Sequence, residues 1–79
     1  MILESQDKMV LHYMAKHKSI TSLEAFEELG ITRLSARIFN LREAGHDIGM
    51  VWEETPNRFG KMVRYGRFFI KKLNKGALK

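Results

Sequence analysis

Residues 33–40 combine side chains whose chemistry suits contact with base pairs. An arginine can donate two hydrogen bonds to guanine O6 and N7, an asparagine can pair with adenine N6 and N7, and a small alanine admits close approach or meets a thymine methyl group. The segment contains Arg33, Ser35, Ala36, Arg37 and Asn40. A helix that reads DNA enters the major groove with its N-terminal residues nearest the bases. If residues 33–40 begin such a helix, these five residues are candidates for contact with double-stranded DNA.

A second polar and basic group follows the single proline, Pro56. It comprises Asn57, Arg58, Lys61 and Arg64. A basic loop beside a recognition helix can reach phosphates or the narrow minor groove, so we include these four residues among the DNA-binding candidates. The alternative is a solvated turn in which the charges of Arg58 and Lys61 discourage pairing between sheet edges.

Basic residues are concentrated in the second half of the chain. The formal net charge is +5 and the isoelectric point is near 9.8. Residues 1–32 hold three basic and five acidic residues, whereas residues 55–79 hold eight basic residues and no acidic one. Such an asymmetry indicates a polyanion that faces the C-terminal half, and the alternative is a surface that serves only solubility.

The residue types that perform catalysis do not assemble into a motif. The chain has no cysteine, and His12, His17 and His46 lack metal-ligand spacing. No nucleophile with a base, glycine-rich phosphate loop or paired carboxylates can be recognised locally. With 79 residues the chain has room for one domain with a modest core. We therefore expect no enzyme, no metal, no cofactor and no small-molecule substrate.

The distribution of apolar residues argues against a membrane or an export route. No apolar run approaches the ~18 residues of a membrane span, and Glu4, Asp7 and Lys8 interrupt the first segment where a signal peptide needs an apolar stretch. The lack of cysteine fits a reducing compartment. We expect a cytoplasmic protein without a membrane partner.

Capping residues predict where the first two helices begin and end. Ser5 or Asp7 can cap the first helix. Thr21 and Glu24 form a T-x-x-E capping box for the second, and Gly30 stands where a helix end needs a left-handed backbone. The predicted inner faces contain Val10, Leu11 and Met14 in the first helix and Ala25, Phe26 and Leu29 in the second.

A third helix is predicted from Arg33 to about Ala44, with Thr32 as its N-cap and Gly45 after its end. Helical spacing places Leu34, Ile38 and Leu41 on its inner stripe and Ala36, Asn40 and Glu43 on its outer one. Only Ile31 separates Gly30 from Thr32, so the second and third helices must meet at a tight angle.

From His46 the apolar period changes to two, which indicates a β-hairpin with its loop at residues 55–60 and its return strand at Met62 to Ile70. Trp52 and Tyr65 are expected in the core. Arg64 and Arg67 are expected on the outer face, unless Gly66 marks a bulge. Residues 1–70 are predicted to form one domain and residues 71–79 a basic flexible tail.

This order of elements resembles a family of small winged helix-turn-helix proteins common in bacteriophages and prophages. The resemblance covers roughly residues 19–70 and rests on Ser19–Ala25, Gly30–Ile38, Leu41–Arg42, Asn57–Lys61 and Val63–Tyr65. It implies an α+β winged helix-turn-helix fold and a DNA-binding role, as a small transcriptional regulator or an accessory factor of recombination or excision in a bacterial host cell.

Several candidate residues also have purely structural interpretations. Arg37 borders the inner stripe and could instead pair with an acidic residue of the second helix, Glu24, Glu27 or Glu28. Asn40 could be an ordinary solvated residue. Phe39 is expected to lie half-buried against the hairpin. Arg33 is poorly placed for stability alone, because the helix dipole disfavours a cation in the first turn.

A different class of function is a protein-interaction module, in which the same fold inhibits or adapts a host or phage protein through its basic surface. A homodimer is a further option, for which Met1, Ile2 and Leu3 together with the exposed side of the first helix offer a surface. RNA is a weaker option, because no pair of exposed aromatic residues at strand spacing is apparent.

Overall fold

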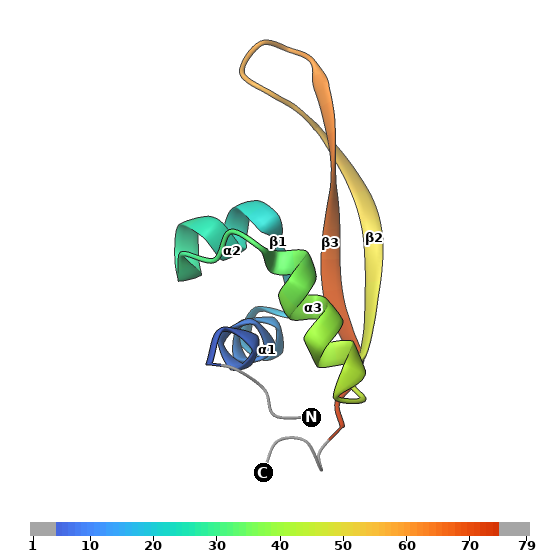
Figure 1. The fold of residues 1–79 in the computed structure, drawn as a ribbon. Coiled ribbons are helices and arrows are strands. Elements are labelled where there is room, and N and C mark those ends of the chain that lie inside the picture. Colours follow the sequence, from blue (N-terminus) through green and yellow to red (C-terminus); the bar gives the residue numbers. More distant parts are fainter. Residues whose placement is uncertain (1–4, 75–79) are drawn as a thin grey trace.

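The computed structural model describes residues 5–74 as three helices and a three-stranded antiparallel sheet. The elements in chain order are α1 (Ser5–His17), β1 (Ser19–Thr21), α2 (Ser22–Leu29), α3 (Leu34–Glu43), β2 (Asp47–Pro56) and β3 (Met62–Lys72). The long β2–β3 hairpin projects well beyond the helices (Figure 1). The predicted α+β class, with three helices followed by a hairpin, is confirmed.

Strand β1 was not expected from the sequence. Its residues pair with β3, with Ile20 opposite Phe68 and Thr21 opposite Arg67. The chain reverses out of α1 through Lys18, which has a left-handed backbone at φ 76°. Three residues are too few to show an alternating pattern, so the sequence alone does not reveal this strand. The strand order β1-β3-β2 therefore places β3 in the middle of the sheet.

The core joins one face of each helix to the base of the sheet. It contains Val10, Leu11, Met14, Ile20, Ala25, Ile31, Leu34, Ile38, Leu41 and Ile48. The predicted inner stripes of α1 and α3 are confirmed. In α2 the prediction holds for Ala25 and Leu29 but is wrong for Phe26, whose side chain is exposed. An eight-residue helix that packs along one narrow line leaves Phe26 on its solvent side.

The turn between α2 and α3 has the predicted capping residues, except at the start of α3. Thr21 and Glu24 form the capping box, and Gly30 takes a left-handed conformation at φ 69°. The backbone N–H groups of Gly30 and Ile31 then donate to Phe26 and Ala25 carbonyls at 3.0 Å. The N-cap of α3 is Arg33, not Thr32, and no side chain caps this end. The first turn of α3 therefore leaves backbone N–H groups without a side-chain acceptor.

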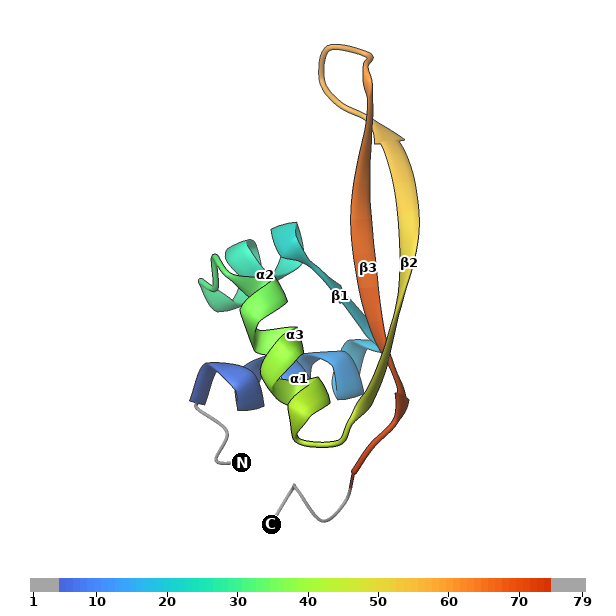
Figure 2. The ribbon, with the colours of Figure 1, turned by 45° about the vertical axis from the view of Figure 1, so that its right-hand side comes forward.

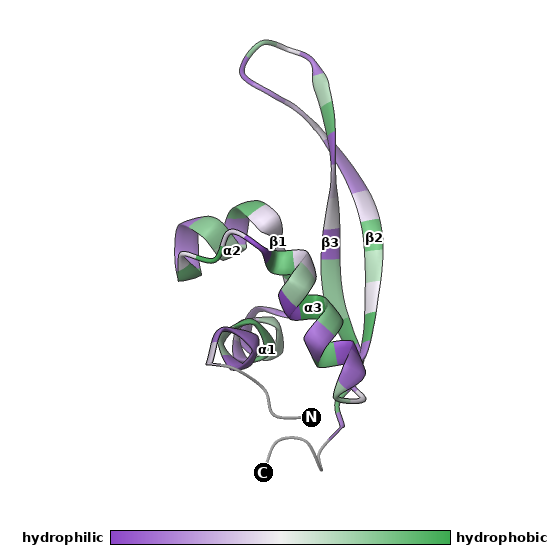
Figure 3. Ribbon diagram, viewed as in Figure 1, coloured by the Kyte–Doolittle hydropathy of each residue, from purple (hydrophilic) through white to green (hydrophobic). Residues whose placement is uncertain are grey.

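The β2–β3 hairpin forms the wing, and its outer part has no layer above it. Pairing continues without irregularity from Ile48 opposite Ile70 to Pro56 opposite Met62. Beyond the last β1 pair, five residues of each strand extend the wing by about 16 Å at ordinary strand rise. Figure 2 shows this part standing clear of the helices, and Figure 3 shows apolar residues along it.

Two expectations about side chains of the outer wing are wrong. Trp52 is 59% exposed, although it was predicted to lie in the core. The pairing has no bulge at Gly66, so strand alternation puts Arg64 on the same face as Phe68 and Arg67 on the opposite face. The two arginines therefore do not share the outer face that was expected for both.

The folded unit extends past the predicted domain boundary at residue 70. Strand β3 continues to Lys72, and Leu73 packs against the core. The backbone N–H of Asn74 donates to His46 Nδ1 at 2.9 Å, and its side-chain amide donates to the Ala44 carbonyl at 2.7 Å. The expected tail thus begins too early. Residues 75–79, and the proposed dimer surface at Met1–Leu3, lie outside the described residues.

Candidate nucleic-acid interface

The solvent-facing stripe of α3 differs from the predicted one. Ser35, Phe39 and Arg42 are exposed at helical spacing, whereas Ala36 and Asn40 are only partly exposed. Phe39 is 60% exposed and not half-buried against the hairpin as expected. The inner stripe of α3 is as predicted and Glu43 is exposed as expected, but the exposed surface extends over the Phe39 flank of the helix and not over the Ala36 and Asn40 flank.

A buried carboxylate on α1 explains why the Arg37 and Asn40 flank of α3 is covered. Asp7 is fully buried, and Arg37 Nη1 approaches its Oδ1 at 3.2 Å. Asn40 Nδ2 lies 3.3 Å from both carboxylate oxygens. Arg37 and Asn40 therefore face α1, and Arg37 pairs with a carboxylate that was not among the three acids of α2 considered from the sequence. Only 16% of the Arg37 side chain is exposed.

The N-terminal end of α3 holds the candidates that remain accessible. Arg33 is exposed at the N-cap position, and Ser35 is exposed in the first turn. Arg33 makes no ion pair with any described residue. A cation at this end opposes the helix dipole, so Arg33 is unfavourable for the helix unless an anion approaches it. The open backbone N–H groups of the first turn add to the attraction for an anion.

The wing loop presents two further cations on a well-ordered turn. Asn57 Oδ1 accepts hydrogen bonds from the backbone N–H groups of Phe59 at 2.9 Å and Lys61 at 3.1 Å. The Asn57 side-chain oxygen is therefore engaged in hydrogen bonds within the loop. Arg58 and Lys61 are exposed and have no carboxylate partner among residues 5–74.

Arg64, the remaining wing candidate, is partly engaged within the wing. Its guanidinium carbon lies 4.7 Å from the centroid of the Trp52 ring, a stacking distance for a cation on an aromatic face. Its Nε lies 3.8 Å from Glu54 Oε1, with both side chains more than half exposed. An exposed pair at this distance contributes little, so Arg64 remains available to a stronger anion.

Arg67 instead ties the wing to the helices, a role that the sequence analysis missed. Its Nε donates to Glu53 Oε1 at 2.8 Å, and its Nη1 lies 3.3 Å from Glu24 Oε1 and 3.0 Å from Ser19 Oγ. The hydrogen bond from Arg67 lowers the pKa of the Glu53 carboxyl. Arg67 therefore has carboxylate partners on both β2 and α2.

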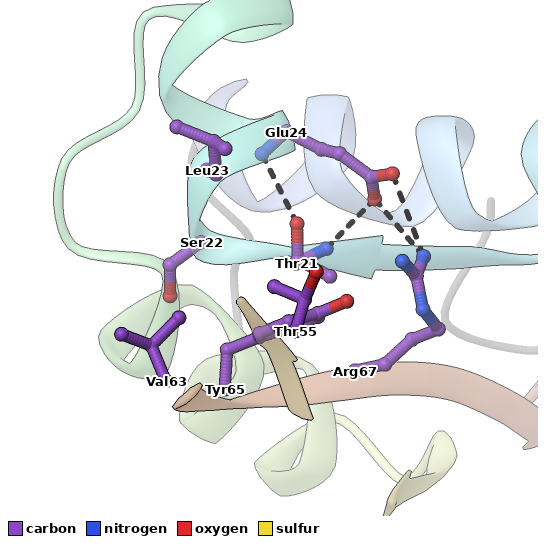
Figure 4. Close-up of a pocket in the computed structure, with 8 residues that line it drawn as sticks. All are labelled: Thr21, Ser22, Leu23, Glu24, Thr55, Val63, Tyr65 and Arg67. Carbon is purple, nitrogen blue, oxygen red and sulfur yellow. Dashed lines mark hydrogen bonds and ion pairs between the residues drawn. The ribbon is translucent and has the colours of Figure 1, made fainter. Parts of the chain in front are cut away.

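Figure 4 shows Arg67 beside a shallow groove between α2 and the wing. The groove has a volume of about 370 Å³. Glu24 completes the capping box with Thr21 on one side, while Leu23, Val63 and Tyr65 line the apolar part. The charged groups at its edge are satisfied by one another, so the groove itself offers no free charge to a ligand.

The two groups of accessible cations lie at the N-terminal end of α3 and in the wing loop. Helix α3 runs toward the base of the wing, so its N-terminal turn lies toward the wing tip (Figures 1 and 2).

The described residues contain no helix long and apolar enough to cross a bilayer. Among the same residues no three His, Asp or Glu side chains are grouped as a metal site requires.

Two helices joined by a tight turn, a preceding helix and a basic β-hairpin together define a winged helix-turn-helix architecture. Residues 5–73 match the family described as "Winged helix-turn-helix domain". Because the match spans most of the chain, the protein belongs to this family. Searches of curated proteins and of solved structures found no match. Family membership suggests DNA binding, and such domains are typically modules without enzymatic activity.

Proposed function

We propose that this protein binds duplex DNA with the N-terminal part of α3 in the major groove and with the wing on the backbone or minor groove. One observation carries the proposal. Arg33, Arg58 and Lys61 lack carboxylate partners among the described residues, whereas Arg37 and Arg67 are paired inside the protein. Cations without a carboxylate partner are thus present at both places where this architecture meets DNA.

The structure narrows the set of residues proposed to contact bases. Arg33 and Ser35 are accessible, and Phe39 joins them because an apolar side chain in the major groove can contact a thymine methyl group. Ala36 remains a candidate for close approach. Arg37 and Asn40, which were candidates for base contact, are proposed instead to fix the position of α3 through Asp7.

The wing residues are proposed to supply affinity without sequence preference. Arg58, Lys61 and Arg64 are on an extended hairpin, where they can reach phosphates. Asn57 is proposed to act by shaping the loop that presents them. On the resemblance of residues 19–70 to small phage and prophage proteins, we further propose a role as a transcriptional regulator or as an accessory factor of recombination or excision.

A pair of matched variants tests the proposal through the salt dependence of binding. The double variant Arg58→Ala/Lys61→Ala should weaken binding to all duplexes alike and reduce the slope of log K against log salt by about 0.9 for each lost phosphate contact. The control Lys8→Ala/Lys16→Ala removes the same charge from the exposed side of α1 and should leave the slope close to that of the parent.

Base contact is tested on a duplex selected from random sequence by the intact protein. Arg33→Ala should cost about 1–3 kcal/mol on the selected site and less on random DNA. It should not lower folding stability, because Arg33 bonds to no other described side chain. If the intact protein binds no duplex more tightly than about 10⁻⁴ M in low salt, the proposal is wrong and the protein-interaction interpretation takes its place.

A further inference from the structure

The tip of the wing carries an apolar side chain that no part of the described fold covers. Phe59 is 80% exposed, which makes it the most exposed large apolar residue of the described chain. Its strand neighbours at the loop, Pro56 and Met62, are themselves exposed and paired with each other. Phe59 therefore exposes its ring to solvent in the β2–β3 loop, and Figure 1 shows this loop at the end of the hairpin away from the helices.

The loop holds the backbone of Phe59 in a defined conformation. The Asn57 carbonyl accepts the Gly60 N–H at 3.0 Å, which makes Arg58 and Phe59 the two central residues of a tight turn. Asn57 Oδ1 accepts the N–H of Phe59 itself, and Gly60 has the positive φ of 80° that closes the turn. A backbone fixed in this way loses little conformational freedom when the tip binds a partner.

The charges beside Phe59 indicate what that partner is. Arg58 precedes the ring and Lys61 follows it by two residues, and neither has a carboxylate partner among residues 5–74. An apolar residue between two unpaired cations suits a polyanion that also offers apolar surface. Duplex DNA meets both requirements, because phosphates line the minor groove and the stacked base faces lie between them.

We propose that Phe59 is a wedge that enters the minor groove, inserts between two stacked base pairs and bends the duplex, while Arg58 and Lys61 hold the adjacent phosphates. The inference rests on the proposed DNA-binding function and adds an activity to it, namely deformation of the DNA. Side chains that insert in this way kink duplexes by about 20–90°. The wing extends about 16 Å past the sheet's last three-stranded position, so its tip can reach DNA beyond the segment that α3 contacts.

The test measures the end-to-end distance of a duplex by energy transfer between dyes on its two ends. The duplex has about 30 base pairs and contains a TA step, which unstacks easily. A fluorescent adenine analogue at that step reports loss of stacking separately. The intact protein should shorten the end-to-end distance and raise the emission of the analogue.

The Phe59→Ala variant should bind with an affinity within about tenfold of the parent, because the lost apolar burial is offset by the unstacking that no longer occurs. It should leave the duplex nearly straight and the analogue stacked. Phe59→Leu should restore most of the bend, because leucine also serves as a wedge. The matched control Phe26→Ala removes a ring that is 58% exposed on α2 and should bend DNA as the parent does.

The possible outcomes separate the two proposals. If the parent binds DNA but leaves it straight, or if Phe59→Ala bends it equally, the wedge is wrong and the DNA-binding proposal stands. If the parent does not bind DNA at all, the proposed function fails and the wedge fails with it.

Discussion

Replacement of Asp7 by alanine is the most informative single change, because it removes the anchor that orients α3. Asp7 is fully buried and accepts contacts from Arg37 and Asn40 across the α1–α3 interface. Loss of one partner of a buried ion pair costs about 3–5 kcal/mol. Arg37 keeps 16% of its side chain exposed and can recover some hydration, so we expect about 2–4 kcal/mol for Asp7→Ala.

This cost is large relative to the stability of such a small domain. A chain of this length has a free energy of unfolding of about 4–12 kcal/mol, and 1 kcal/mol shifts the melting midpoint of a small domain by about 4–8 °C. Asp7→Ala should therefore lower the midpoint by about 8–32 °C. Thermal and urea unfolding followed by circular dichroism measure the effect.

Two comparisons make the Asp7 experiment decisive. Glu27→Ala removes a carboxylate from the exposed side of α2 and should stay within about 0.5 kcal/mol of the parent. The double variant Asp7→Ala/Asn40→Ala should show a coupling of about 0.5–3 kcal/mol, as contacting residues do. If Asp7→Ala melts within about 1 °C of the parent, the buried cluster does not orient α3, and Arg37 and Asn40 return to the list of base-contact candidates.

Two further predictions concern the core and the pH dependence of folding. Leu41→Ala should lower the free energy of unfolding in urea by about 2–5 kcal/mol, because Leu41 is fully buried. Leu23→Ala, at an exposed site, should lower it little. Equal losses would mean that the inner face of α3 is misassigned. Burial lowers the pKa of His46 below its usual 6.5, so the unfolded chain binds the proton first and stability should fall as the pH drops below about 6.5. Between about pH 7.5 and 5.5, His46→Asn should lose less stability than the parent, as measured by urea unfolding. An identical loss in both proteins would mean that His46 does not cause the pH dependence.

Local signals in the sequence were sufficient for the helices and for the general class of the fold. The capping box at Thr21 and Glu24, the left-handed position at Gly30 and the apolar stripe of α3 depend on residues within one or two turns of each other. The change of apolar period after Gly45 likewise located the hairpin. Each of these features is decided by the backbone and by neighbouring side chains, so a single sequence reveals them.

The sequence shows where the basic residues lie along the chain, but it does not show which arginines are paired with carboxylates in the folded protein. Arg33 and Arg58 remain accessible, whereas Arg37 is bound to Asp7, thirty positions earlier in the chain. Arg67 is bound to Glu24 and Glu53. A charge pair between distant segments has no spacing rule, so only the packed structure distinguishes a paired arginine from one that is accessible to a ligand.

What the sequence by itself determined was the three helices, the β2–β3 hairpin, the capping box of α2 and the basic character of the C-terminal half. Tertiary structure alone decided which flank of α3 is covered, because the buried Asp7 on α1 requires partners and draws Asn40 toward it, while Phe39 stays exposed. It also decided that β1 pairs with β3 and that Trp52 lies on a wing beyond the core. These outcomes depend on contacts between segments far apart in the chain, and their free energies exceed the local preferences that a sequence pattern records.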